Sequence, residues 1–433
     1  MKLTVFNADK GDSLLLTSAD GRSMLCDGGT PGAYRTSIRP ALANHLPAHG
    51  HLDVVYISHI DEDHIGGVLA LLDDAMDWKV FRVHEKAGDT QFKKPKVPEP
   101  PRIGNIWHNA FHELIKDNTG AIGDLLAANA LSLRLIDAGW ARFAGARSAT
   151  IVNSIPQAIK VSRRVSASQL GIPLNRPAKG KLMLRGQPAG AAKIGSMRIS
   201  TLAPAETDLK VLRDEWNDWL RDNSETLKAI RAAARADEDR LETGFPPADA
   251  AVLMIALRTL GNRSKVTPPN LASLMLHVEE NGKTMLLTGD GHSDDLIAGL
   301  ENAGMVANGG GLHVEVLKVP HHGSEHNIKK TFPPRVTADH YVFCGNGFSG
   351  NPELDVVQAF IDSRLGPANA LSANPEAKRP FEFWFSSSAK VAPPNYKAHM
   401  RAVEKLVRGA VAASKKKMTA HFLSDGPLTI DLS

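Results

Sequence analysis

The chain has 433 residues, 42% of them hydrophobic and 23% charged, which is ordinary for a globular protein and more than one minimal domain needs. Its two cysteines, Cys26 and Cys344, lie far apart in the sequence, which excludes a disulfide framework and a cysteine metal cluster. We see no apolar run near the ~20 residues of a membrane span and no basic-then-apolar leader, so we expect a soluble, cytoplasmic protein without membrane contact.

The net charge of +4 is unevenly distributed along the chain. Residues 138–205 contain no Asp or Glu but eleven Lys or Arg residues. A long window of one sign indicates a polyanionic partner such as nucleic acid, whereas the alternative is a solvated face balanced by acidic neighbours in space. The residues that we expect to contact nucleic acid are Arg163, Arg164, Arg176, Lys179 and Lys181.

The N-terminal segment, residues 2–29, predicts two or three short strands separated by turns at Lys10-Gly11-Asp12 and Asp20-Gly21. Residues 36–46 have a helical pattern, and "LDVVYISH", residues 52–59, predicts a short buried strand. "GGVLALLDDAM", residues 66–76, predicts a helix, because its apolar residues recur at helical spacing. A polar loop between this strand and this helix is therefore expected at the carboxyl end of the strand.

That loop, "SHIDEDHIGG", concentrates five titratable residues in six positions. They are His59, Asp61, Glu62, Asp63 and His64. Like charges at this spacing repel one another, and burying them is costly unless a positive charge lies among them. A structural role rarely requires such a cluster, so the loop predicts a metal site whose other ligands lie elsewhere in the chain.

The middle of the chain is less regular. A Pro-rich connector, residues 93–105, precedes a stretch with helical periodicity, residues 121–143, and residues 206–242 are charged and helical in pattern. We expect His84 near the site where a strand ends. His108 and His112 are four residues apart on an expected helix, a spacing that suits one metal-binding face, but we expect Trp107 and His108 to line the site mouth or the core instead. His292 is expected to cap a turn or helix.

Two later segments repeat the pattern of an apolar strand that ends in a metal-binding side chain. "KTMLLTGD" ends at Asp290 between two glycines, and "VEVLKVPHHGS" places His321 and His322 after a strand. Each is ambiguous alone, since a strand-end Asp before Gly is commonly a turn residue and a His pair is commonly on the surface. Together with the six-residue cluster they indicate a metal site.

With these segments the sequence resembles the metallo-β-lactamase superfamily, and within it the branch containing the soluble hydrolase domain of ComEC-type DNA-uptake proteins. The resemblance rests on "NADKGDSLLL", "MLCDGG", "SHIDEDHIGG", "NLASLML" before "LLTGD", and "LKVPHHGS". It implies an α/β fold, an αββα sandwich with the site at one edge and a large, partly helical insertion. The expected units are a core in residues 1–85 and 195–365, a basic insertion in 86–194, a charged helical insertion in 206–264 and an α/β extension in 366–433.

The resemblance also implies a ligand set for two divalent ions. His59 and Asp61 would hold one ion, Asp63, His64 and a histidine of the 321/322 pair the other, and Asp290 would bridge them, with His321 as first choice and His322 next. Asp61 and Asn270 stand where the family commonly has histidine, and "Gly350-Asn351-Pro352" replaces a Gly-His-Pro motif. An oxygen-rich set favours harder ions, so manganese or magnesium is expected besides zinc.

The same resemblance suggests roles in hydrolysis. Asp63 would orient the attacking water, His322 could donate a proton to the leaving group, and His84, Asn270, Ser324 and Asn346 would contact substrate. Our main hypothesis is a nuclease or phosphodiesterase acting on DNA or RNA. The alternatives are a hydrolase of a small ester, lactone or cyclic nucleotide, and a catalytically idle interaction module.

Overall fold

The computed structural model describes residues 1–47, 50–89, 93–109, 161, 164–167, 169–186, 190–209 and 272–433. The helical stretch expected at 121–143 and most of the charged insertion at 206–264 lie outside these residues, as do His112, Arg163 and Asn270. The expected unit boundaries therefore remain predictions.

The first sheet has six strands in the order β16-β1-β2-β3-β5-β7. Three antiparallel strands form its N-terminal part, and β5 and β7 are added parallel to β3. The C-terminal strand β16 pairs antiparallel with β1. The strands are β1 (Lys2–Val5), β2 (Leu14–Thr17), β3 (Ser23–Cys26), β5 (Val54–Tyr56), β7 (Ile106–Trp107) and β16 (Leu428–Asp431).

The second sheet has eight strands in the order β15-β14-β13-β12-β11-β10-β9-β8. Strands β8 to β11 are antiparallel, and β12 to β15 run parallel to β11. The strands are β8 (Ala192–Ile194), β9 (Met197–Ala203), β10 (Met275–Glu280), β11 (Lys283–Leu287), β12 (Leu312–Lys318), β13 (Val336–Phe343), β14 (Phe381–Phe385) and β15 (Met418–Phe422). A small separate pair joins β4 (His51–Leu52) and β6 (Arg102–Ile103).

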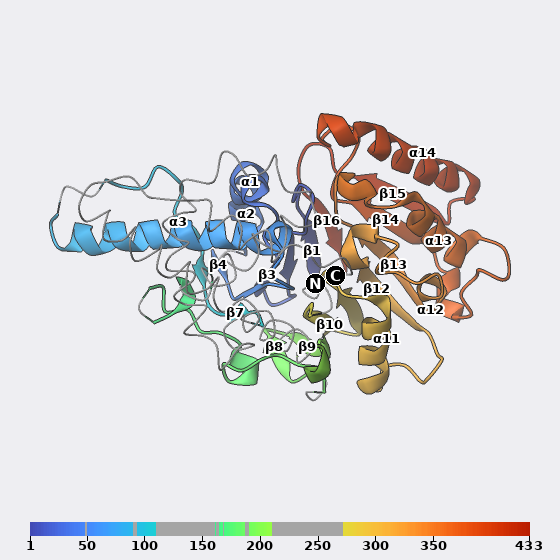
Figure 1. The fold of residues 1–433 in the computed structure, drawn as a ribbon, viewed down its shortest axis with the longest axis horizontal. Coiled ribbons are helices and arrows are strands. Elements are labelled where there is room, and N and C mark those ends of the chain that lie inside the picture. Colours follow the sequence, from blue (N-terminus) through green and yellow to red (C-terminus); the bar gives the residue numbers. More distant parts are fainter. Residues whose placement is uncertain are drawn as a thin grey trace, which may run out of the picture.

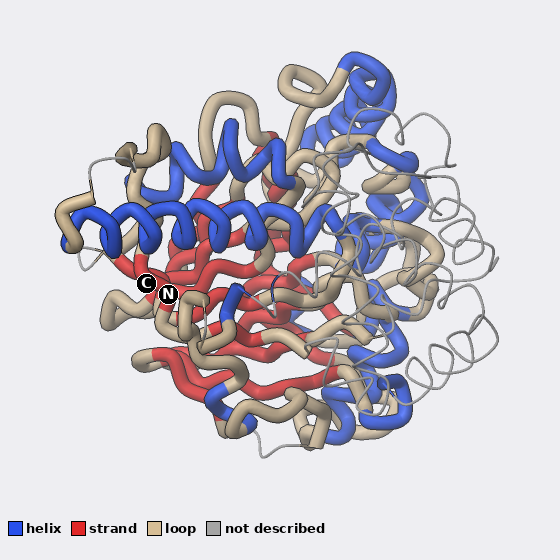
Figure 2. Tube along the Cα trace, turned by 60° about the vertical axis from the view of Figure 1, so that its left-hand side comes forward, coloured by secondary structure: helices blue, strands red, loops and turns tan. Residues whose placement is uncertain are grey.

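Helices cover the outer face of each sheet (Figures 1 and 2). The first sheet carries α1 (Pro31–Ala33), a π-helical turn (Tyr34–Ile38), α2 (Arg39–His45) and α3 (Glu62–Lys86). The second carries α11 (Ser293–Asn302), α12 (Phe332–Arg335), α13 (Leu354–Leu365) and α14 (Lys397–Ala413). Short 3₁₀ turns lie at Arg176–Ala178, Pro320–Gly323, Phe348–Gly350, Pro375–Lys378 and Pro394–Tyr396.

Three layers of buried side chains hold this arrangement together. Because successive side chains of a strand point to opposite faces, Val55 of β5 packs with the core beneath α3, whereas Val54 and Tyr56 pack between the sheets with Leu276 and Leu287. A third core lies between the second sheet and α11 to α14. Helix, sheet, sheet and helix therefore form four layers, which confirms the α/β fold expected from the sequence.

The C-terminal residues are part of both sheets. Strands β14 and β15 extend the second sheet, and α14 packs on its outer face. Strand β16 then crosses to the edge of the first sheet. Within the described residues, no helix combines the length and the apolar character that crossing a bilayer requires.

Candidate metal centre

The candidate centre lies where strands of both sheets end. Asp27 follows β3 and His59 follows β5, which are parallel neighbours, so both lie at one edge of the first sheet. Asp290 follows β11, and His321 follows β12, its parallel neighbour in the second sheet. The two sheets therefore present their polar strand ends to the same region.

The six-residue cluster is positioned by the start of α3. Helix α3 begins at Glu62, with Asp61 at the N-cap position and Asp63 in the first turn. Acidic side chains are favourable there, because the first turn has unpaired N–H groups and the positive end of the helix dipole. His64 follows in the same turn and is fully buried.

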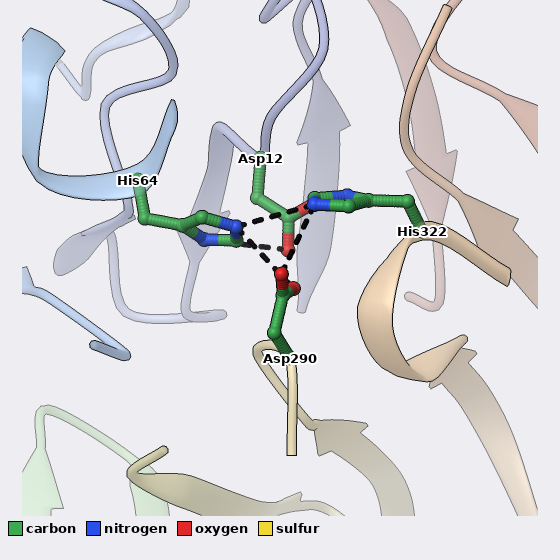
Figure 3. Close-up of side chains that lie close together, drawn as sticks. All are labelled: Asp12, His64, Asp290 and His322. Atoms are coloured by element: carbon green, nitrogen blue, oxygen red, sulfur yellow. Dashed lines mark hydrogen bonds and ion pairs between the residues drawn. The ribbon is translucent and has the colours of Figure 1, made fainter. Parts of the chain in front are cut away.

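Four imidazoles point their Nε2 atoms at the carboxylate of Asp290. The Nε2 atoms of His59, His321 and His322 lie 3.8, 3.5 and 3.1 Å from its Oδ2. The Nε2 atom of His64 lies 3.3 Å from its Oδ1. His64 and His322 approach Asp290 from opposite sides (Figure 3). Asp290 therefore lies at the centre of the four imidazoles, and its role as a bridging carboxylate remains a prediction.

The other nitrogen of each imidazole is held by a neighbouring polar group. The pairs are His59 with Ser58 Oγ at 3.0 Å, His64 with Asp27 Oδ2 at 2.9 Å, His321 with Asn327 Oδ1 at 2.6 Å and His322 with Asp12 Oδ1 at 3.1 Å. In metal sites such contacts fix the ring orientation and leave Nε2 to the ion. All four rings thus keep Nε2 directed at Asp290.

The predicted ligands divide into two groups around Asp290. His59 Nε2 lies 3.7 Å from Asp61 Oδ2, which forms one group. His322 Nε2 lies 3.8 Å from Asp63 Oδ2 and 3.4 Å from His64 Nε2, which forms the other. The sequence favoured His321 as the partner of Asp63 and His64, but in the structure His322 occupies that place.

The histidine pair follows β12 in an uncommon backbone conformation. His321 and His322 have φ angles of 44° and 55°, in the left-handed region. For residues other than glycine this costs about 1–2 kcal/mol each. Consecutive left-handed residues direct both rings to Asp290, so a backbone that is unfavourable locally brings two imidazoles to one carboxylate.

Electrostatics within the centre favour bound positive charge. Burial alone raises the pKa of Asp290, but His322, His64 and His321 outweigh burial and hold that pKa well below its usual value. Burial lowers the pKa of His322, but Asp290 and Asp12 raise it to about 9. The same balance of burial against Asp290, Asp27 and Asp12 raises the pKa of His64 well above its usual value.

The residues fit a divalent cation. Asp12, His64, Asp290 and His322 are buried, and each offers a ligand atom within 4.8 Å of the others. Among the described residues, no group forms a hydrogen bond with His59 Nε2 or Asp290 Oδ1, although both atoms are buried. Imidazole nitrogens and carboxylate oxygens without such partners are the ligands that zinc and manganese take.

Three buried residues of the centre were missed from the sequence. Asp12 and Asp27 lie in the quoted "NADKGDSLLL" and "MLCDGG" motifs, but nothing in their spacing connects them with particular histidines. Lys318 precedes the His pair by three residues and contacts the carboxylate of Asp12. The repeated strand-then-polar pattern would have suggested Asp27, whereas Lys318 resembles an ordinary strand lysine.

Two of the predicted substrate contacts, Ser324 and Asn346, form hydrogen bonds with nearby protein groups. Ser324 is buried, and its hydroxyl lies 3.4 Å from Glu353 Oε1. Asn346 donates to Asp9 Oδ1 at 2.5 Å and accepts from the Phe348 backbone at 3.1 Å. Both side chains thus make turn contacts next to the His322 loop, and their role toward substrate remains a prediction.

Two expectations about position are wrong. His84 does not follow a strand but lies in the last turn of α3, where it contacts Asp89 at 3.0 Å. At a rise of about 1.5 Å per residue it is roughly 30 Å along the helix from His64. His108 follows strand β7, is buried and is not part of a helix, whereas His112 lies outside the described residues. His292 caps α11 by accepting from Asp294 N, as expected.

Comparisons with known proteins add little to this description. No family model matches the chain, and no curated protein matches it. Among solved structures, the 1.98-Å crystal structure of Zn²⁺-bound PqqB from Methylobacterium extorquens aligns over 100% of both chains, with 10% identity and a TM-score of 0.34. The description of the centre therefore depends on its own geometry: an α/β sandwich that brings four imidazoles and several carboxylates to one buried point.

Proposed function

We propose that this protein is a metal-dependent hydrolase, and specifically a phosphodiesterase or nuclease that acts on DNA or RNA with two divalent ions. The observation that carries the proposal is the convergence of four imidazole Nε2 atoms on Asp290, with Asp61 and Asp63 beside them. A pair of divalent ions at such a site lowers the pKa of water and stabilises the charge that develops during displacement.

The chain's own groups have separate roles in this proposal. Asp63 is the least buried of the centre's carboxylates, with 15% of its side chain exposed, and it lies in the first turn of α3. This exposure supports a role for Asp63 in orienting a water molecule between the centre and the substrate. His322 directs Nε2 to Asp290 and is tied at Nδ1 to Asp12, which supports ligation more than proton donation.

The ligand chemistry supports manganese or zinc, with magnesium as a further candidate. Four imidazoles suit zinc, whereas the carboxylates of Asp61, Asp63 and Asp290 suit the harder ions that also bind phosphate oxygens. A phosphodiester substrate would use this second property directly.

Part of the segment without acidic residues, 138–205, supports a polyanionic substrate. Arg176, Lys179 and Lys181 are exposed and, among the described residues, form no ion pair with a carboxylate. Their turn is anchored by Asn175, which bonds the backbone of His108 at the end of β7, the strand beside β5. Arg164 instead pairs with Asp73 at 2.7 Å, so it contributes less to the proposed interface.

The test is hydrolysis by metal-stripped protein of bis-p-nitrophenyl phosphate and of single- and double-stranded DNA, with manganese, zinc or magnesium restored separately. Asp63→Ala and Asp290→Ala should each lower the manganese-restored rate by at least about 100-fold. Asp355→Ala, which removes an exposed carboxylate of α13, serves as the matched control and should leave the rate unchanged.

Each other outcome selects another function. Metal binding without cleavage of any phosphodiester would overturn the nuclease proposal and favour a small-molecule ester or lactone. Protein that binds none of the three ions would overturn the hydrolase proposal and favour an interaction module.

A further inference from the structure

Lys318 is a fully buried lysine at the end of β12, with 1% of its side chain exposed. Its ammonium group contacts Asp12 Oδ2, donates to the backbone oxygen of Gly289 at 2.7 Å and lies 3.7 Å from Asp290 Oδ1. Burying an ammonium group without such partners costs several kcal/mol, so its place beside two carboxylates of the centre needs a reason.

Lys318 contacts two carboxylates that also contact imidazoles of the centre, those of Asp12 and Asp290. Asp12 gives Oδ2 to Lys318 and Oδ1 to the Nδ1 atom of His322. Asp290 has Oδ1 on the side of Lys318, while three imidazoles face its Oδ2. The Nε2 atom of His64 also lies 3.3 Å from Asp290 Oδ1, so the lysine shares this oxygen with one imidazole and leaves Oδ2 to the other three.

The backbone around Lys318 fixes this position. The backbone oxygen of Lys318 accepts from Thr288 Oγ at 2.8 Å, while its ammonium group bonds the oxygen of Gly289. Both ends of the residue are therefore tied to the segment that joins β11 to Asp290. A movement of Lys318 would move the bridging carboxylate with it.

The balance of charges in the centre gives a reason for a lysine at this position. Among the described residues, five carboxylates lie within 4 Å of an imidazole of the centre, namely Asp12, Asp27, Asp61, Asp63 and Asp290. With the one ammonium group of Lys318, they leave four negative charges. Two divalent ions carry four positive charges. With Lys318 present, the centre is therefore neutral when it holds both ions.

We propose that Lys318 is a positioning residue that acts as a fixed cation of the metal centre, holding Asp12 and Asp290 in place and setting the charge that bound ions meet. This inference rests on the proposed two-ion hydrolase. It predicts that the lysine limits the affinity for ions while it raises the acidity of groups beside it, because a fixed positive charge repels cations and favours deprotonation.

The test compares Lys318→Met, Asp12→Asn and the double variant Asp12→Asn/Lys318→Met with the wild type. Manganese alone is titrated calorimetrically into each metal-stripped protein. We expect Lys318→Met to bind manganese up to about tenfold more tightly than the wild type, and Asp12→Asn about tenfold more weakly. The double variant should return to the wild-type affinity, since the two charge changes cancel.

A second readout is the pH–rate profile with bis-p-nitrophenyl phosphate. The acid limb should move up by about one pH unit in Lys318→Met, move down in Asp12→Asn and return in the double variant. Lys283→Met, which removes a half-exposed lysine of β11, is the matched control and should change neither readout.

The outcomes separate this proposal from the proposed function. Weaker manganese binding by Lys318→Met, with an unmoved acid limb, would mean that the lysine only supports the fold, and would overturn the inference alone. Wild-type protein that binds no manganese would overturn the proposed function and this inference together. If Lys318→Met does not fold, the double variant is compared with Asp12→Asn instead. If the double variant binds manganese no more tightly than Asp12→Asn does, the inference is overturned.

Discussion

At the scale of single residues, the centre depends on buried groups that do not themselves face Asp290. Asp27 accepts from the backbone and hydroxyl of Ser58, at 2.8 and 2.7 Å, and holds Nδ1 of His64 at 2.9 Å. One carboxylate thereby orients both the loop that carries His59 and the ring of His64. Its contribution can be measured without any substrate.

We expect Asp27→Asn to lower manganese affinity by about 10–100-fold, because an amide orients His64 but does not supply the carboxylate's charge. Calorimetric titration of metal-stripped protein measures the change. Asp355→Asn, on the exposed face of α13, is the control. Equal affinity of the Asp27 variant and the control would contradict a role for this carboxylate.

Gly11 allows the turn that carries Asp12 to touch α3. A Cβ atom at this position would lie 1.7 Å from the backbone oxygen of Asp63. We therefore expect Gly11→Ala to separate Asp12 from the first turn of α3, lowering the free energy of unfolding by about 1–3 kcal/mol and weakening manganese binding. Urea unfolding and calorimetry measure the two effects.

The matched control is Gly409→Ala in α14, where an added Cβ meets no atom within 4 Å. Alanine there should raise the stability by about 0.5–1 kcal/mol, since glycine is unfavourable within a helix. A Gly11 variant that behaves like the Gly409 variant would show that the close approach at Asp63 is unimportant.

At this scale the sequence was informative where polar residues are clustered or follow an apolar strand. The loop from His59 to His64 concentrates charge that is costly to bury without a cation, so it predicts a metal site directly. Asp12, Asp27 and Lys318 reach the centre through chain folding, and their types are common in turns and strands. Their roles follow only from the folded structure, because spacing in the sequence says nothing about contacts between the two sheets.

At the scale of elements, α3 shows how tertiary structure overrides local pattern. Its first turns were predicted from apolar spacing, but "KVFRV", residues 79–83, is rich in strand-forming residues, and His84 was expected at a strand end. In the structure the helix continues to Lys86, and Trp78 is buried and donates from Nε1 to the backbone oxygen of Val97 at 3.1 Å. Local propensity is weak against such packing.

The turn at Arg176–Ala178 gives a prediction at the same scale. Replacing Arg176, Lys179 and Lys181 together by alanine should weaken DNA binding at low salt, and the slope of log affinity against log salt should become shallower by about 0.9 for each lost phosphate contact. Fluorescence anisotropy across a salt series measures this slope.

Replacing Lys415, Lys416 and Lys417 together removes the same charge from the exposed turn that follows α14 and serves as control. If both triple variants change the slope equally, net charge rather than the turn accounts for binding. If neither changes it, nucleic acid does not contact the turn.

At the scale of the whole molecule, the centre makes stability depend on pH. The pKa of His322 is raised to about 9 and that of His64 is raised as well, against an unfolded value of about 6.5. A raised pKa stabilises the fold below the unfolded value, and the stabilisation is lost as the pH rises through the folded value. Metal-free protein should therefore lose stability between about pH 6.5 and 9.

Thermal unfolding in EDTA across this range measures the effect as a falling Tm. His322→Gln is expected to flatten the dependence, since glutamine does not titrate. A Tm that rises from pH 6.5 to 9 in the metal-free wild type would contradict the prediction, because the histidines would then be neutral in the folded protein.

The origin of the ligands in two sheets has a consequence for folding. Asp12, Asp27 and His59 come from the first sheet, and Asp290 and the His pair from the second. An ion shared by both groups binds only while the sheets are docked, so its binding free energy adds to their docking rather than to the stability of either sheet. The metal would then belong to the interface between sheets as fully as Tyr56 packed against Leu276, and chelation would loosen that interface before it unfolds either layer.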